Sequence, residues 1–172
     1  VADKRLGLQK LGLQEGDKCA IYAPATVNYI ETLFAMWSVG VVAVPLNTRL
    51  PVGQIDKLLN FINCDSLILE SASGLCTSLR CYQLSGIEYQ TGKKSIEVYF
   101  KLDSDATIIF TSGSTGVGKA CLHTFGNHWY SALGSNRNIR IGPGDAWLLS
   151  LPLYHVSGIA ILFRCLSSGG AI

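Results

Sequence analysis

The first seventy residues alternate between short apolar runs and segments whose apolar side chains have helical spacing. The runs at 19–23, 41–45 and 66–69 have the length and composition of buried strands. Between them, apolar residues recur every three or four positions after Thr26 and again after Pro51, which are residues that commonly begin helices. This β-α-β-α-β order predicts an α/β fold in which a parallel-rich sheet is flanked by helices.

The rest of the chain continues this pattern less regularly. The first dozen residues predict a helix closed by Gly12, and residues 71–103 predict irregular structure with short strands. Later segments predict a buried strand at 107–110, a helix after Thr124, a strand at 146–151 and a helix from 157 to 166 that ends near Gly169. Large aromatic side chains expected in the core are Trp37, Phe125 and Trp129.

Composition excludes several classes of protein. Only 15% of the 172 residues are charged, whereas about 25% is usual, which argues against a disordered chain or a coiled coil. The 14 basic residues against 12 acidic ones are scattered, so we expect no nucleic-acid partner. The most apolar stretch, 30–46, is shorter than the roughly 20 residues of a membrane span. Six cysteines without a CxxC pair predict a cytoplasmic protein. None of this fixes an oligomeric state.

The segment after the strand at 107–110 contains the most specific chemistry in the sequence. Its nine residues, 111–119, read Thr-Ser-Gly-Ser-Thr-Gly-Val-Gly-Lys. Glycines let backbone N–H groups approach phosphate oxygens, hydroxyls add donors, and an ammonium group offsets negative charge. The segment therefore predicts a polyphosphate site, with a flexible Gly/Ser turn as the alternative.

A P-loop nucleotide site is one interpretation of this segment. Gly113, Gly118 and Lys119 have the spacing of that motif, but the next position is Ala120 where the motif needs Ser or Thr to hold Mg²⁺. A P-loop also follows the first strand of its domain, whereas several βα units precede this one.

A family resemblance is the other interpretation. Residues 111–120 resemble the Thr-Ser-Gly-[Ser/Thr]-Thr-Gly-x-Pro-Lys-Gly signature of the acyl-adenylate-forming enzymes, with Gly118 in place of Pro and Ala120 in place of Gly. Residues 16–21, 40–47 and 151–158 resemble other motifs of the family in the same order. The resemblance implies that residues 1–172 are a partial N-terminal AMP-binding (adenylation) domain, truncated at both ends, without the C-terminal domain.

The chemistry that this resemblance implies has two steps. A small-molecule carboxylate attacks the α-phosphate of ATP, which is bound with Mg²⁺, and the thiol of coenzyme A then displaces AMP from the acyl-adenylate. Residues implied to hold the nucleotide are Thr111, Ser112, Gly113, Ser114, Thr115, Gly116 and Lys119. They would act by neutralising charge and by positioning the phosphates, and Lys119 counts among the catalytic residues.

The acyl site is implied at the Pro-Leu-Tyr-His segment. His155 would be a second catalytic residue that contacts substrate beside Tyr154, since an imidazole can donate to a developing oxyanion. The alternative for His155 is a core histidine, and Ser157 suits either substrate contact or a helix N-cap. Arg164 could pair with a carboxylate or lie at a solvent-exposed edge. We expect no protein metal site, because Cys121, His123 and His128 match no common zinc spacing.

Within the family, residues 123–132 and 147–159 are similar to the branch that joins CoA to o-succinylbenzoate in menaquinone biosynthesis. A fatty or aryl acid–CoA ligase is the alternative inside the family, and a P-loop-type protein or a non-enzymatic remnant is the alternative outside it. The family's later Tyr-Gly-x-Thr-Glu motif and C-terminal lysine are not among these 172 residues. We therefore expect the chain to be inactive by itself.

Overall fold

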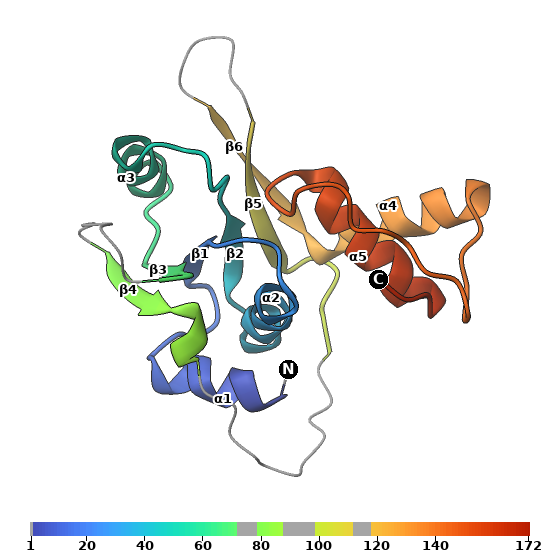
Figure 1. The fold of residues 1–172 in the computed structure, drawn as a ribbon, viewed down its shortest axis with the longest axis horizontal. Coiled ribbons are helices and arrows are strands. Elements are labelled where there is room, and N and C mark those ends of the chain that lie inside the picture. The colour runs from blue at the N-terminus through green and yellow to red at the C-terminus, as the bar shows by residue number, and fades with distance from the viewer. Residues whose placement is uncertain (1, 72–78, 88–98, 112–117) are drawn as a thin grey trace.

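A computed structural model describes residues 2–71, 79–87, 99–111 and 118–172. Its centre is a six-stranded sheet (Figure 1), whose strands lie in the order β4 (Arg80–Gln83), β3 (Ser66–Leu69), β1 (Lys18–Tyr22), β2 (Val42–Pro45), β5 (Asp105–Thr111) and β6 (Lys119–Thr124). All neighbouring pairs are parallel except β5 and β6, which are antiparallel. The predicted fold class, a parallel-rich sheet flanked by helices, is confirmed.

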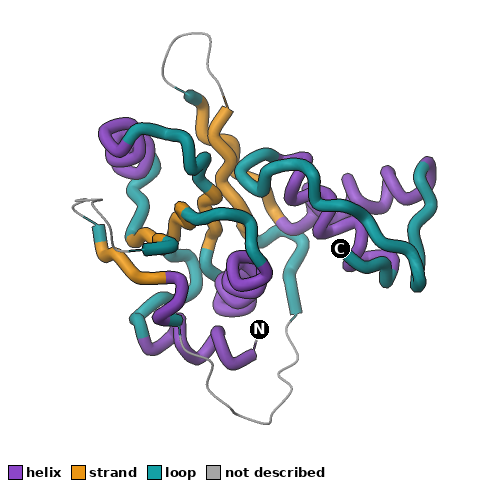
Figure 2. The backbone as a smooth tube through the Cα atoms, in the orientation of Figure 1, coloured by secondary structure: helices purple, strands orange, loops and turns teal. Residues whose placement is uncertain are grey.

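Helices cover both faces of this sheet (Figure 2) and are connected to it by short loops. They are α1 (Ala2–Lys10), α2 (Val27–Val39), α3 (Val52–Phe61), α4 (Phe125–Asn138) and α5 (Val156–Ser168), with a 3₁₀ turn, η1, at Leu84–Gly86. Alternate strand residues point to opposite faces, so Ala20 joins one core with α3 while Cys19 and Ile21 join another with the remaining helices. Burial on both faces explains why these strands are apolar throughout.

Most helix boundaries follow the local chemistry that the sequence shows. The Thr26 side chain accepts a hydrogen bond from the N–H of Tyr29 and caps α2. At α4 the side chains of Thr124 and Asn127 form a reciprocal capping box. Gly169 closes α5 in the left-handed conformation, with φ 76°. The predicted helices and the strands β1, β2, β3 and β5 are therefore confirmed.

Three expectations about the second half are wrong or incomplete. Residues 146–151 form no strand, because only Ala146 makes a bridge, to Ala171. The edge strand β6 was not expected, since neither of its faces is fully buried and its sequence has no apolar alternation. Trp129 is 36% exposed on α4 rather than in the core, whereas Trp37 and Phe125 are buried. Only one face of α4 packs against the protein, and Trp129 is not fully covered by that face.

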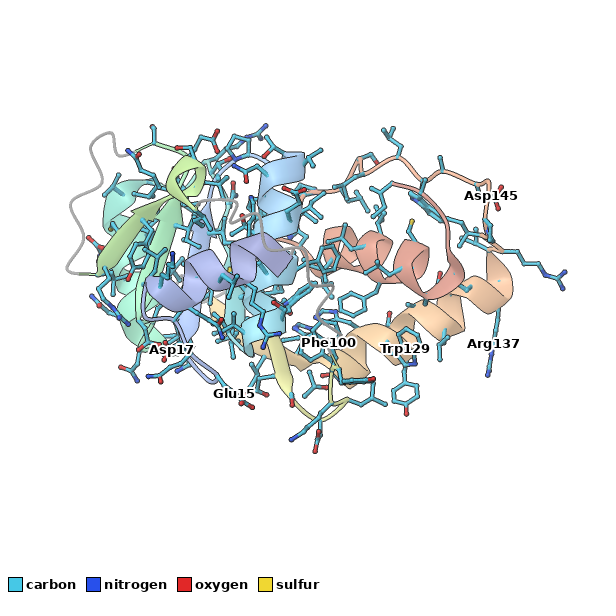
Figure 3. The ribbon with its side chains drawn as sticks, turned by 90° about the horizontal axis from the view of Figure 1, so that it is seen from below. Glu15, Asp17, Phe100, Trp129, Arg137 and Asp145 are labelled. Carbon is cyan, nitrogen blue, oxygen red and sulfur yellow. The ribbon has the colours of Figure 1, made fainter. Side chains whose placement is uncertain are left out.

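The α4–α5 pair extends sideways from the sheet. Figure 3 shows Arg137 and Asp145 at the end of the molecule furthest from the strands. None of the helices in the described ranges is long and apolar enough to cross a membrane.

Candidate active site

The carboxyl ends of the parallel strands define the candidate site. Strands β1, β2 and β5 run in the same direction, so Tyr22, Pro45 and Thr111 end at one edge of the sheet. Ligands of open α/β sheets bind outside this edge, where loops can present polar groups without disturbing the strands. The phosphate-binding segment predicted from the sequence begins at this edge.

Thr111 and Lys119 form the neck of that segment. They are paired across β5 and β6, and the Thr111 hydroxyl donates to the Lys119 carbonyl oxygen at 3.5 Å. Both residues are exposed, which leaves the Lys119 ammonium group available to a ligand. Gly118 is required here, since a Cβ at this position would lie 2.6 Å from the Thr111 carbonyl oxygen. Five predicted phosphate ligands lie outside the described residues: Ser112, Gly113, Ser114, Thr115 and Gly116.

The strand after this segment contradicts the P-loop interpretation. A P-loop continues directly into a helix, whose N-terminus contributes to phosphate binding. Lys119 instead begins β6, which returns antiparallel to β5. A P-loop site is therefore excluded by topology as well as by the missing hydroxyl at Ala120.

A small pocket lies at the same edge. Its volume is about 140 Å³, and its lining residues are Ala23, Pro24, Ala25, Tyr29, Leu46, Thr48, Pro152, Leu153 and Tyr154. The pocket brings the Pro-Leu-Tyr segment against the loops that follow β1 and β2. The loops after β1 and β2 were not predicted from the sequence to line a pocket. Their position directly after two buried strands could have indicated it, because ligands of such sheets bind where the strands end.

His155 lies immediately beside this pocket, at the N-cap of α5. Its side chain is exposed, so the core-histidine interpretation is wrong. The rings of Tyr154 and His155 are 4.7 Å apart between centroids. Ser157 is exposed within the first turn of α5 and is not the N-cap. The helix therefore carries an exposed imidazole at its N-terminal end, next to the pocket residue Tyr154.

Comparison with known proteins shows the family of the chain. Residues 6–172 match the family described as AMP-binding enzyme. The chain belongs to the AMP-binding enzyme family. It is 35% identical over 170 residues to the 2-succinylbenzoate–CoA ligase of Oceanobacillus iheyensis, an alignment that covers 94% of this chain and 35% of that protein. The chain thus spans about a third of the length of this curated relative.

Solved structures of the family have the same fold. The o-succinylbenzoate–CoA synthetase of Bacillus subtilis with the acyl-adenylate intermediate matches with a TM-score of 0.89 and 29% identity, over 98% of this chain and 46% of that one. The same enzyme with ATP and a magnesium ion matches with a TM-score of 0.86 and 30% identity, over 99% of this chain and 48% of that one.

Two other histidines, His123 and His128, form a stack. The rings of His123 and His128 lie 5.3 Å apart, and His128 Nε2 is hydrogen-bonded to Thr107 Oγ1 at 2.7 Å. Burial, reinforced by His123, lowers the pKa of His128 to about 4. No cluster of three or more metal-ligating side chains occurs among the residues that the structure describes. No local sequence pattern predicts the bond between Thr107 and His128, because the two residues belong to different elements.

Two buried cysteines are poor nucleophiles. Burial raises the pKa of Cys19 to about 12 and that of Cys64 to about 11. Since the thiolate is the reactive form, neither thiol is suited to covalent chemistry at neutral pH.

Arg164 is the other charged group with an unusual environment. It lies on α5, with the guanidinium carbon 5.3 Å from the centroid of the Trp147 ring. Its buried Nε has no hydrogen-bond partner within the described ranges. A buried guanidinium N–H without an acceptor favours an anionic ligand, because an unmet donor costs free energy.

Proposed function

We propose that this chain is the N-terminal part of the adenylation domain of a CoA ligase whose acid is o-succinylbenzoate. The domain activates the acid with Mg-ATP and transfers the acyl group to the thiol of coenzyme A. The observation that carries the proposal is the common location of the Thr111–Lys119 neck and the His155 pocket at one sheet edge. The curated relative named above is a ligase for this acid and CoA.

The neck has the chemistry that nucleotide phosphates require. The Lys119 ammonium group offsets the charge that accumulates when the carboxylate attacks the α-phosphate and pyrophosphate leaves. The Thr111 hydroxyl adds a donor beside it. Ser112, Gly113, Ser114, Thr115 and Gly116 complete the proposed phosphate ligands, and Mg²⁺ arrives with the phosphates and adds positive charge to them.

His155 is proposed to act on the carboxylate. An exposed imidazole at a helix N-terminus can donate a hydrogen bond to the oxygen on which negative charge develops when the carboxylate attacks the α-phosphate. Tyr154 lines the pocket beside it and limits the space for the acid. Ser157, exposed in the first turn of α5, is the third proposed acyl contact.

Arg164 supports a diacid substrate. o-Succinylbenzoate has two carboxylates, and only one of them reacts. The other needs a cationic partner, and Arg164 lies on α5, the helix that His155 caps, about two and a half turns further along. Its guanidinium N–H without an acceptor supplies that partner.

The remaining two thirds of the length of the relative would supply the rest of the enzyme. The Tyr-Gly-x-Thr-Glu motif and the C-terminal lysine that the family resemblance implies would belong to that part. We propose a cytoplasmic location, which the free thiols of Cys19, Cys64, Cys121 and Cys165 support.

Product analysis of the complete protein tests this proposal. The protein is incubated with Mg-ATP, CoA and one acid at a time, and the acyl-CoA is identified by mass spectrometry. We expect turnover with o-succinylbenzoate and much less with benzoate or decanoate, which lack the second carboxylate. Replacement of Arg164 by Leu should raise KM for o-succinylbenzoate and leave the weak benzoate reaction unchanged. Preferential turnover of decanoate would overturn the assignment of the acid.

A further inference from the structure

Strand β5 contains a β-bulge four to five residues before the phosphate-binding neck. Asp105 pairs with Thr124, and Thr107 pairs with the preceding residue of β6, His123, so Ala106 is an extra residue on β5. A bulge bends its strand and increases the local twist, and bulges often re-aim side chains next to active sites. The bulge at Ala106 therefore fixes the direction in which β5 and β6 continue toward Thr111 and Lys119.

Two buried side chains hold the bulge from different helices. Trp37 on α2 donates its indole N–H to the carbonyl oxygen of Ala106 at 2.9 Å. His128 on α4 shares a 2.7 Å hydrogen bond with the hydroxyl of Thr107, the next residue of β5. Ala106 and Thr107 are completely buried, and Trp37 and His128 are 3% and 2% exposed. Loss of either bond would leave a buried polar group without its partner.

The helices that supply these groups are also packed against one another. Phe163 of α5 stacks on the His128 ring at 4.9 Å and lies 5.4 Å from the Trp37 ring. The N–H of Phe125, at the start of α4, donates to the carbonyl oxygen of Ser104, just before β5. Helices α2, α4 and α5 therefore pack together around the side chains that contact the β-bulge of β5.

Beyond the bulge, strand β5 stays in the core through Ile108 and Ile109 and then becomes exposed at Thr111. Within the described residues, β5 pairs with β2 at one position, Thr107 with Ala43, and from Ile108 onward β5 pairs with β6. Figure 1 shows the two strands extending past their neighbours. The direction of this extension is consequently determined at its base.

We propose that Trp37, Thr107 and His128 are positioning residues for the nucleotide, which act by holding the bulge and thereby aim Thr111 and Lys119 at the phosphates. This inference rests on the proposed function, because it assigns the aimed groups to ATP. The inference predicts that a substitution at the base of the β5–β6 hairpin alters the use of Mg-ATP although the substituted residue does not contact the nucleotide.

The test compares two identical substitutions in the complete protein. Thr107→Val removes the hydroxyl that contacts His128 and preserves the shape of the side chain. Thr32→Val is the matched control, since Thr32 is equally buried and hydrogen-bonded but lies on α2, where its partners are Asn28 and Lys4. Thr107→Ser restores the hydroxyl.

We expect Thr107→Val to raise KM for Mg-ATP in ATP–pyrophosphate exchange by about three- to tenfold, the factor that corresponds to one buried hydrogen bond. KM for the acid should stay within about twofold, Thr107→Ser should recover most of the loss, and Thr32→Val should leave both values unchanged. The backbone amide NMR signals of Thr111 and Lys119 should shift in Thr107→Val only.

Two results contradict different claims. If both Val variants lower the unfolding midpoint and neither changes KM for Mg-ATP or the two amide signals, the inference is overturned and the bonds only stabilise the fold. If the wild-type protein shows no exchange with any acid, the proposed function fails instead. In that case unchanged amide signals in Thr107→Val would also show that the bulge does not aim the hairpin.

Discussion

Gly158 lies so close to Pro152 that a Cβ at position 158 would be 2.2 Å from the Pro152 carbonyl oxygen. This contact joins the first turn of α5 to the segment that lines the pocket, and it holds His155 between them. Gly158→Ala should therefore displace the segment and lower the free energy of unfolding by about 1–3 kcal/mol, the usual cost of overpacking. Urea unfolding measures the loss.

Gly134→Ala is the control for that substitution. Gly134 is an exposed helical residue with open space where a Cβ would be placed. Alanine there should stabilise the protein by about 0.5–1 kcal/mol, because it reduces the freedom of the unfolded chain. Equal stability changes in the two variants would contradict the role given to the Gly158 contact.

Lys119→Ala should weaken the use of Mg-ATP in the complete protein. Loss of a charge-assisted contact to phosphate is expected to raise KM for Mg-ATP about tenfold or more. Steady-state kinetics measure the effect, with Lys57→Ala on the exposed face of α3 as the control. Equal KM values for Mg-ATP in the two variants would show that Lys119 does not contribute to nucleotide binding.

His155→Ala should act mainly on kcat. If the imidazole stabilises charge only in the transition state, its loss slows adenylation about a hundredfold with little change in KM for the acid. Rapid-quench measurement of acyl-adenylate formation separates this step from CoA transfer. A rise in KM at constant kcat would instead make His155 a residue that only binds substrate.

Stability should fall as the pH is lowered through the range in which His128 titrates. Its pKa is lowered from 6.5 to about 4 in the folded protein. The unfolded state therefore binds more protons between those values, and stability that is fully present above pH 6.5 is lost toward pH 4, by about 3 kcal/mol at most. Urea unfolding at several pH values measures this, and His128→Gln should reduce the slope. An unchanged slope would contradict the buried, neutral state of His128.

Local sequence patterns predict most strands and helices of the fold because each pattern reflects one physical requirement, such as burial of a strand or capping of a helix. Buried strands such as β2 are apolar on both faces, and Thr26 and Thr124 supply caps whose chemistry is local. Strand β6 could not be predicted in this way, because its conformation depends on its pairing with β5 and not on a pattern in its own side chains. Residues 146–151 have a strand-like composition, but one bridge to Ala171 does not make a ladder.

The candidate site was predictable to the extent that its chemistry is contiguous in the chain. The neck residues Thr111 and Lys119 and the pair Tyr154–His155 each lie within one motif. The bond between His128 and Thr107, and that between Trp37 and Ala106, join residues 21 and 69 positions apart. No local pattern specifies such contacts, because they depend on how three helices pack on the sheet.

ATP–pyrophosphate exchange tests the central claim most directly, since it reports carboxylate adenylation without requiring CoA. The complete protein should catalyse exchange that depends on o-succinylbenzoate and falls sharply in Lys119→Ala, while the 172-residue chain alone should show negligible exchange. Absence of acid-dependent exchange in the complete protein, or robust exchange by the isolated chain, would contradict the account.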